Sequence, residues 1–378
     1  MRNISICGRQ VQQSKPPPSL VQTVSIEGVE VRCGLIYTED VEFDPNAVEN
    51  EVKVLVKKRA FSCNYRDKSF IFKAAINAPN DRFYTVGSDF VAEVVQKGSL
   101  VSDLQIGDRV IANNSYPDPA APDLRPGIPT NHASKEYQTF HHKQLLKIPA
   151  EISDATAASF SIGGQTVYSM LRKLDIQPGA NVLVTAAKSN TSLFVINALK
   201  QYGVNLYATS TSLQFEQELQ QLGVKQLIQV DPTHSSWLSN PVMAEVYRQT
   251  GGFDYIVDPF FDLHIGKVVP LFPPMRGGKY VTCGLYDQYS SLIGQEFQYH
   301  GLSLGQIFSF MMLNNIQIIG NCLGTTQDLS QAIHDCAAGR LKVIVDAVFS
   351  GSQVSDFFDR TYNAKDRFGK VVYQFSHE

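Results

Sequence analysis

The sequence predicts an α/β protein in two parts, a β-rich part first and a doubly wound, mostly parallel sheet after it. Between residues 20 and 56, short alternating apolar runs are separated by acidic or glycine-containing turns, as in antiparallel strands. From residue 179 to 319, short β-branched runs alternate with segments of helical periodicity, which is typical of a sheet covered by helices on both faces. The chain has 378 residues, more than the roughly 300 that one core usually supports, so we expect two domains.

The first part begins with polar residues and a Lys-Pro-Pro-Pro run, so we expect residues 1–20 to form an extended, flexible arm. After the runs of residues 20–56, glycines punctuate further strand patterns over residues 84–112. Residues 113–135 are rich in Pro, Asn and Asp and predict a long surface loop. A strand pattern returns over residues 136–147, which completes an all-β part.

One segment of this part, residues 60–72, interrupts the strand pattern with a dense polar group. This group is Asn64, Tyr65, Arg66, Asp67 and Lys68. Polar side chains of several kinds between apolar flanks suit a cleft wall that orients a substrate and passes a proton. The alternative is a solvated turn at the start of a helix.

The second part is organised around a strand, turn, helix, strand unit over residues 178–212. An apolar run at Asn181–Thr185 predicts the first strand, helical spacing predicts a helix over Ser192–Tyr202, and Val204–Ala208 predicts the second strand. This is the unit that binds dinucleotides, with phosphate at the helix N-terminus. The turn has Ala187, Ser189 and Ser192 where such a unit usually has glycines. The alternative is an ordinary turn with Ser192 as the helix cap.

Two helical patterns precede this unit, and strand and helix patterns alternate after it to the end of the chain. We expect helices at 153–158, 166–174, 213–222, 241–249 and 331–338, and strands at 226–230, 255–257, 279–283, 316–319 and 369–373.

Composition excludes several classes of function. The net charge is −3 with scattered Lys and Arg, which argues against nucleic acid or an anionic membrane as partner. There is no membrane-spanning apolar run and no signal-like start, so we expect a cytoplasmic protein. The six cysteines form no CxxC pair, so we expect reduced thiols and no zinc knuckle.

Seven segments, in order, resemble the medium-chain dehydrogenase/reductase superfamily, in particular its zinc-free quinone oxidoreductase and enoyl reductase type. They are residues 64–67, 86–91, 106–110, 166–168, 253–258, 277–281 and 369–372. The resemblance implies a GroES-like β domain over residues 21–150 and 325–378, with a Rossmann domain inserted over residues 151–324. It also implies a homodimer through the edge strand at residues 316–319.

Zinc-dependent members of this superfamily place a cysteine and a His-Glu pair in the first half. Here Asn64 and Ser88–Asp89 stand at those positions, and the loop at 113–135 has no cysteine. Zn²⁺ needs three or four nitrogen or sulfur ligands, so we expect no metal site.

Without a metal to polarise a carbonyl, the expected reaction is hydride addition to an activated C=C bond, as in a quinone, enone or enoyl substrate. The resemblance assigns Asn64 to the nicotinamide and substrate cleft, with Tyr65, Arg66 and Lys68 as candidate donors. Two alternatives remain open: a tailoring reductase of a natural product or peptide, such as a dehydroalanine reductase of lanthipeptide biosynthesis, and a non-catalytic nucleotide-binding relative.

NADPH is expected in preference to NADH, because no acid stands at Thr209–Ser212 to hold a ribose 2′-OH. Lys188 in the turn is a candidate partner for a phosphate. The predicted cofactor contacts are Thr166, Ala187, Lys188, Ser189, Asn190, Thr191, Ser192, Ser210, Thr211, Cys283 and Gly284.

Overall fold

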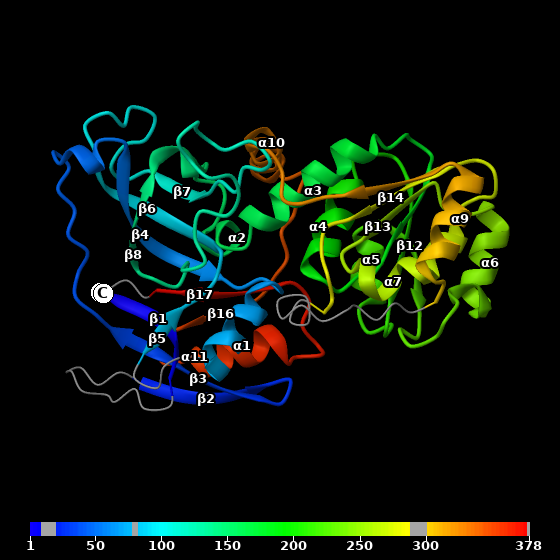
Figure 1. The fold of residues 1–378 in the computed structure, drawn as a ribbon, viewed down its shortest axis with the longest axis horizontal. Helices are drawn as coiled ribbons and strands as arrows, with labels where there is room; N and C mark the ends of the chain where they lie inside the picture. Colours follow the sequence, from blue (N-terminus) through cyan, green and yellow to red (C-terminus); the bar gives the residue numbers. More distant parts are fainter. Residues whose placement is uncertain (9–19, 78–81, 288–300, 376–378) are drawn as a thin grey trace. The chain divides into compact units, whose positions relative to one another are not determined.

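A computed structural model describes residues 1–8, 20–77, 82–287 and 301–375, and its contacts divide the chain into two compact units. The first unit contains residues 1–164, 325–337 and 343–378, and the second contains residues 165–324 and 338–342. Figure 1 shows the mixed strands of the first unit and the parallel strands of the second. The structure therefore has the α/β class that the sequence predicts. Residues 151–164, which the sequence assigned to the inserted domain, are counted with the first unit.

The first unit is built on two sheets. One has the strand order β2 (Leu20–Ile26), β3 (Val29–Tyr37), β1 (Arg2–Cys7), β5 (Phe83–Thr85). The other has the order β16 (Val345–Ser350), β17 (Lys370–Gln374), β4 (Lys53–Ser62), β6 (Asp89–Lys97), β7 (Arg109–Ala112), β9 (Leu145–Lys147), and β8 (Tyr137–His141) pairs with β4. All these pairs are antiparallel except β16 with β17. Because β17 pairs with β4, segments from the two ends of the sequence meet in one sheet.

The start of the chain corrects the prediction of a flexible arm. Arg2–Cys7 is a central strand that pairs with β3 and β5, and its Ile4 and Ile6 are fully buried. Arg2 also forms a 2.7 Å ion pair with Glu136. The apolar residues of this short segment alternate with polar ones, and burial against two neighbouring strands outweighs its polar appearance. Residues 9–19, which carry the Lys-Pro-Pro-Pro run, lie outside the described residues.

Four helices accompany these sheets: α1 (Asp67–Asn77), α2 (Asp154–Ala157), α10 (Thr326–Ala337) and α11 (Val354–Tyr362). Helices α1 and α11 pack on the four-stranded sheet, and the rings of Phe61, Phe357 and Tyr373 lie within 6 Å of one another in the core. The polar segment at residues 60–72 therefore ends a buried strand and begins a three-turn helix. Residues 113–135 contain no regular helix or strand, as predicted.

The second unit is a six-stranded parallel sheet. Its order is β12 (Val224–Gln229), β11 (Asn205–Ser210), β10 (Asn181–Val184), β13 (Tyr255–Asp258), β14 (Gly278–Thr282), β15 (Ile316–Gly320). The strand order reverses at β10, which continues to β11 on one side and is joined to β13 on the other. Ligands of doubly wound sheets bind beyond the carboxyl ends of the strands at such a reversal.

The helices of this unit are α3 (Ser161–Leu174), which begins in the first unit, α4 (Asn190–Leu199), α5 (Glu216–Gln221), α6 (Pro241–Thr250), α7 (Phe261–Val268) and α9 (Leu304–Asn314). Their ends follow local chemistry. Asn240 caps α6 and is followed by Pro241, while Gly251 ends this helix in the left-handed conformation, with φ of 71°. Of these helices the sequence missed α7 and α9, and in the first unit it missed α11.

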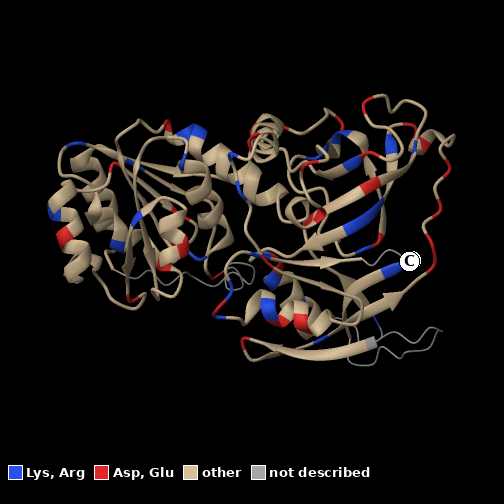
Figure 2. Cartoon of the chain, turned by 180° about the vertical axis from the view of Figure 1, so that it is seen from behind, with Lys and Arg blue, Asp and Glu red and all other residues tan. Residues whose placement is uncertain are grey.

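Charged residues of both signs are interspersed along the ribbon of each unit, as Figure 2 shows. None of the six cysteines takes part in a disulfide. Within the described ranges, no helix is long and apolar enough to cross a membrane.

Candidate functional site

The polar segment after β4 is shaped by Asp67, the first residue of α1. The Asp67 backbone N–H donates to the Asn64 carbonyl oxygen at 3.0 Å, and the Asp67 carboxylate accepts from the Asn64 N–H at 2.7 Å. The carboxylate also lies in the first helical turn, where the helix dipole favours negative charge. Asp67 is buried, and this burial raises its pKa, although the neighbouring Arg66 guanidinium acts to lower it.

Lys370, which the sequence did not single out as a site residue, contacts this segment from the last strand. Its ammonium donates to Asn64 Oδ1 at 2.7 Å and to the Cys63 carbonyl oxygen at 3.3 Å. It also lies 3.1 Å from Ser62 Oγ and from Asp89 Oδ2. The side chains of Lys370 and Asp89 are 2% and 0% exposed, so this is a fully buried ion pair.

Four further hydrogen bonds complete this network. Asn64 Nδ2 donates to Asp89 Oδ2 at 2.8 Å and to Ser88 Oγ at 3.2 Å. The Ser88 hydroxyl donates to the Asp67 carboxylate at 2.9 Å, and the Ile162 N–H at the start of α3 donates to Asp89 Oδ1 at 2.8 Å. Both N–H groups of the Asn64 amide are therefore engaged inside the protein, and its oxygen accepts from Lys370.

These residues do not suit a zinc ion. The positions at which zinc-dependent relatives are expected to place ligands hold an amide, a hydroxyl and one carboxylate, and Zn²⁺ prefers cysteine, histidine and carboxylate ligands. The space between the Asn64 amide oxygen and the Asp89 carboxylate is filled by the Lys370 ammonium. Among the residues that the structure describes, no three His, Cys, Asp or Glu side chains lie close enough to share a metal ion.

The other predicted catalytic residues fall into two groups. Lys68 donates to the Tyr65 hydroxyl at 3.1 Å, lies 4.3 Å from the centre of the Tyr65 ring and forms a 2.7 Å ion pair with Glu27. Arg66 instead donates to Asp67 Oδ1 at 3.1 Å and to Asn131 Oδ1 at 2.9 Å. Within the segment the Asp67 side chain is thus buried, whereas Asn64, Tyr65 and Lys68 are partly exposed.

In the second unit, the turn between β10 and α4 closes without glycine. Ala186 adopts a left-handed φ of 47°, and the Ala187 N–H donates to the Thr209 carbonyl oxygen of the neighbouring strand at 2.8 Å. Ser189 is the helix cap, and its hydroxyl oxygen accepts from the Ser192 N–H at 3.1 Å. Ser192 is buried and its hydroxyl donates to the Thr185 carbonyl oxygen at 2.7 Å. The cap is therefore Ser189 rather than Ser192, and both hydroxyls stabilise the turn.

Lys188 connects this turn to the end of β11. Its ammonium donates to Ser212 Oγ at 3.2 Å, and no acidic residue occurs between Thr209 and Ser212. Thr209 Oγ1 is buried, and within the described part of the chain it neither donates nor accepts a hydrogen bond. A cation and an unsatisfied hydroxyl at the carboxyl ends of β10 and β11 suit the polar groups of a pyridine dinucleotide. The residues present therefore fit this cofactor.

A buried acid at the same edge of the sheet was missed. Asp258, the last residue of β13, accepts from Thr185 Oγ1 at 2.6 Å, from Tyr280 OH at 2.6 Å and interacts with His264 Nδ1 at 2.8 Å. Burial alone would raise the pKa of Asp258, but His264 and these donors lower it overall. An acid that ends an apolar strand run was the available signal. This carboxylate ties together the ends of β10, β13 and β14.

The remaining predicted cofactor contacts lie in the same unit. Cys283 and Gly284 directly follow β14, and burial raises the pKa of the Cys283 thiol to about 12, so this thiol stays protonated at neutral pH. Thr166 lies on α3, where its carbonyl oxygen accepts from Asn321 Nδ2 at 3.4 Å. Asn190 and Thr191 form the first turn of α4, and Ser210 and Thr211 lie at the end of β11.

Comparison with known proteins agrees with this architecture. Residues 50–150 match the alcohol dehydrogenase GroES-like domain. An acryloyl-coenzyme A reductase of Metallosphaera sedula is 24% identical over 345 residues, which cover 87% of this chain and 93% of that protein. An NAD-dependent alcohol dehydrogenase structure has a TM-score of 0.74 at 22% identity, with full coverage of both chains.

The quinone oxidoreductase of Escherichia coli complexed with NADPH has a TM-score of 0.68 at 17% identity, with 99% of this chain and 100% of that chain covered. The two structural neighbours show the shared fold. With the GroES-like domain, the inserted parallel sheet and these relatives, the chain is similar to oxidoreductases of the medium-chain dehydrogenase/reductase superfamily.

Proposed function

We propose that the protein is a reductase that uses NADPH to reduce an activated C=C bond without a zinc ion. The observation that carries this proposal is the buried Lys370 ammonium, which bonds to Asn64 and Asp89 where a zinc-dependent relative would need metal ligands. A carbonyl without a Lewis acid is a poor hydride acceptor. A double bond conjugated to a carbonyl accepts hydride at its β-carbon if hydrogen bonds stabilise the resulting enolate, and a proton from solvent then adds to the α-carbon to complete the reduction.

NADPH, when bound, would supply the hydride. Tyr65 is the proposed donor to the enolate oxygen, because its phenol carries an O–H group and its oxygen accepts from the Lys68 ammonium. The Lys68 ammonium makes the phenol a stronger donor by polarising its oxygen. Asn64 is then a positioning residue, since its amide groups are engaged by Lys370, Asp89 and Ser88.

A change of Tyr65 to Phe tests this role. Loss of one preorganised donor typically costs about 3 kcal/mol, or roughly a hundredfold in kcat. We expect Tyr65→Phe to lower kcat by that factor with little change in the Kd for NADPH. Tyr247→Phe is the control, since Tyr247 OH makes only a 3.4 Å bond to a backbone carbonyl in the second unit. Equal kcat values for the two variants would contradict the role of Tyr65.

The reaction class is tested by a screen with NADPH, in which its absorbance is followed with an enone, a quinone, acryloyl-coenzyme A and a dehydroalanine peptide. Turnover of at least one of these acceptors, with no oxidation of simple alcohols, is expected. Turnover of the peptide alone would favour the tailoring reductase. A protein that binds no NADPH and reduces none of them would be a non-catalytic relative. About one zinc per chain after dialysis would contradict the metal-free mechanism.

The choice of NADPH over NADH rests on Lys188 and on the lack of an acid at the end of β11. A carboxylate there would repel a 2′-phosphate and hold a 2′-OH. Lys188 instead places a cation beside Ser212, and a charge-assisted hydrogen bond to phosphate is stronger than one between neutral groups.

A homodimer is proposed through β15 and α9. Among the described strands, β15 pairs only with β14, so its other edge is open. Beside it, Phe308 and Met312 are 62% and 74% exposed on one face of α9, and Leu313 and Ile318 are also exposed. A second copy of this chain, paired edge to edge, would cover both the open strand and these apolar side chains.

A further inference from the structure

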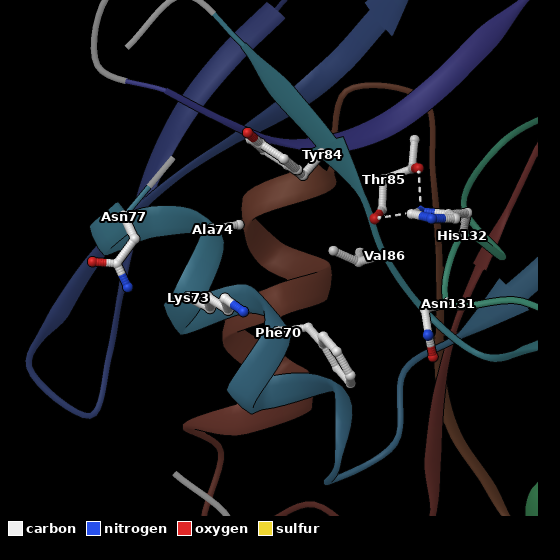
Figure 3. Close-up of a pocket in the computed structure, with 9 residues that line it drawn as sticks. All are labelled: Phe70, Lys73, Ala74, Asn77, Tyr84, Thr85, Val86, Asn131 and His132. Atoms are coloured by element: carbon white, nitrogen blue, oxygen red, sulfur yellow. Dashed lines mark hydrogen bonds between the residues drawn. The ribbon is translucent and has the colours of Figure 1, made fainter. Parts of the chain in front are cut away.

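A cavity lies within the first unit, between α1 and β5. Its volume is about 270 Å³. The lining residues are Phe70, Lys73, Ala74, Asn77, Tyr84, Thr85, Val86, Asn131 and His132. Figure 3 shows that the first four project from one side of α1, at helical spacing, and that Tyr84, Thr85 and Val86 come from the strand segment opposite. This volume is at the small end for a ligand pocket and suits a compact molecule.

The walls of this cavity are largely apolar and aromatic. The Phe70 ring is 39% exposed, which is unusual for a side chain on a packed helix, and the partly exposed Tyr84 ring belongs to the opposite wall. Val86 and Ala74 contribute aliphatic surface. Aromatic walls of this kind favour a flat ligand, because ring faces and edges pack at preferred offsets against another π-system.

Lys73 is the only lining residue with a full charge at neutral pH. It has no ion-pair or hydrogen-bond partner among the residues that the structure describes. His132 is neutral there, because burial lowers its pKa, although the contact of its Nδ1 with the Thr85 carbonyl oxygen at 3.2 Å acts to raise it. The cavity therefore offers a largely apolar space with a single cation at its side.

Arg66 holds the cavity in shape without supplying a second charge to it. The guanidinium carbon lies 5.1 Å from the centre of the Phe70 ring, on which it packs as a cation over a π-face. It also donates to Asn131 Oδ1, and its charge is paired with the Asp67 carboxylate at 3.1 Å. Two walls of the cavity are thus fixed by one residue.

We propose that this cavity is a binding site for a small aromatic carboxylate, with the flat body of the ligand against Phe70 and its carboxylate at Lys73. The site goes beyond the proposed reductase function. It uses neither the Tyr65–Lys68 pair nor any residue of the second unit, so it can be occupied and measured without cofactor.

The test is titration calorimetry of the full chain, without NADPH, with cinnamate and with cinnamamide, which has the same flat body and no charge. Cinnamate is expected to bind about two- to fivefold more tightly, as is typical of one partly exposed ion pair. Lys73→Met should remove this difference, Lys73→Arg should preserve it, and Phe70→Ala should weaken both ligands alike. Lys200→Met, which removes an exposed lysine of the second unit, is the matched control and should change nothing.

The proposal is overturned if cinnamate shows no saturable binding, if both ligands bind equally to the unchanged protein, or if Lys200→Met weakens cinnamate as much as Lys73→Met does. Circular dichroism of each variant checks that the fold is retained; both Phe70 and Lys73 are exposed, so their replacement leaves the core intact. Binding of cinnamate by a protein that reduces none of the four acceptors would support the cavity and contradict the reductase. Reduction without binding would do the opposite.

Discussion

Replacement of Lys370 by Met is the sharpest test of the buried network. The change removes the ammonium and leaves the Asp89 carboxylate, which is 0% exposed, without its cation. The Asn64 amide oxygen and the Ser62 hydroxyl lose the same partner. Breaking a buried ion pair from one side costs about 3–5 kcal/mol, because a charge is left buried without compensation.

For a folding unit of roughly 200 residues, a loss of this size lowers Tm by about 6–20 °C. The assay is thermal and urea unfolding of the full chain, followed by near-ultraviolet circular dichroism. Because the chain has two units, the transition of the first unit must be separated from that of the second before a free energy is assigned.

Two further variants make the result interpretable. Lys143→Met breaks an ion pair with Asp103 whose side chains are 47% and 41% exposed, and it should cost no more than about 1 kcal/mol. The double variant Lys370→Met/Asp89→Asn removes both buried charges and keeps an acceptor for the Ile162 N–H. It should regain at least half of the loss. A Lys370→Met protein as stable as Lys143→Met would refute the description of Lys370 and Asp89 as a buried ion pair that stabilises the first unit.

Three other predictions follow from single contacts. Burial alone would raise the pKa of Glu136, but its bonds to Arg2 lower this pKa overall. The stability that Glu136 contributes is therefore present above about pH 4.3 and is lost as the pH falls through the lower pKa of the folded state. Glu136→Gln should flatten the decline of the unfolding free energy below that pH, and an unchanged slope would contradict this. Lys188→Ala should raise the Kd for NADPH about tenfold and leave that for NADH unchanged, as measured by fluorescence titration; an equal loss for both would remove the argument for a 2′-phosphate site. Phe308→Glu should convert a dimer to a monomer in light scattering, whereas Leu100→Glu, at an exposed apolar position of the first unit, should not.

The sequence alone determined the strands of the second unit and most of its helices, but not α7 and α9. Its strand and helix periods are local properties of consecutive residues, so Asn181–Val184 and Pro241–Thr250 were placed within one or two residues of their final bounds. The order of the seven superfamily segments was equally visible in the linear chain. The polar group around Asn64 was recognised as well, because a cluster of unlike polar residues between apolar flanks needs no tertiary information to be seen.

Tertiary structure decided how that group is used. Lys370 lies 306 residues from Asn64 and reaches it because β17 runs antiparallel to β4, with Val372 opposite Ser62. Gly369 makes this possible, since its φ is 116° and a Cβ there would lie 2.5 Å from the Ile344 carbonyl oxygen. No local pattern contains such a pairing. Strand partners in a sheet are selected by burial and register between segments that are distant in the sequence. For the same reason Arg2–Cys7, which the sequence placed in a flexible arm, is a central strand between β3 and β5.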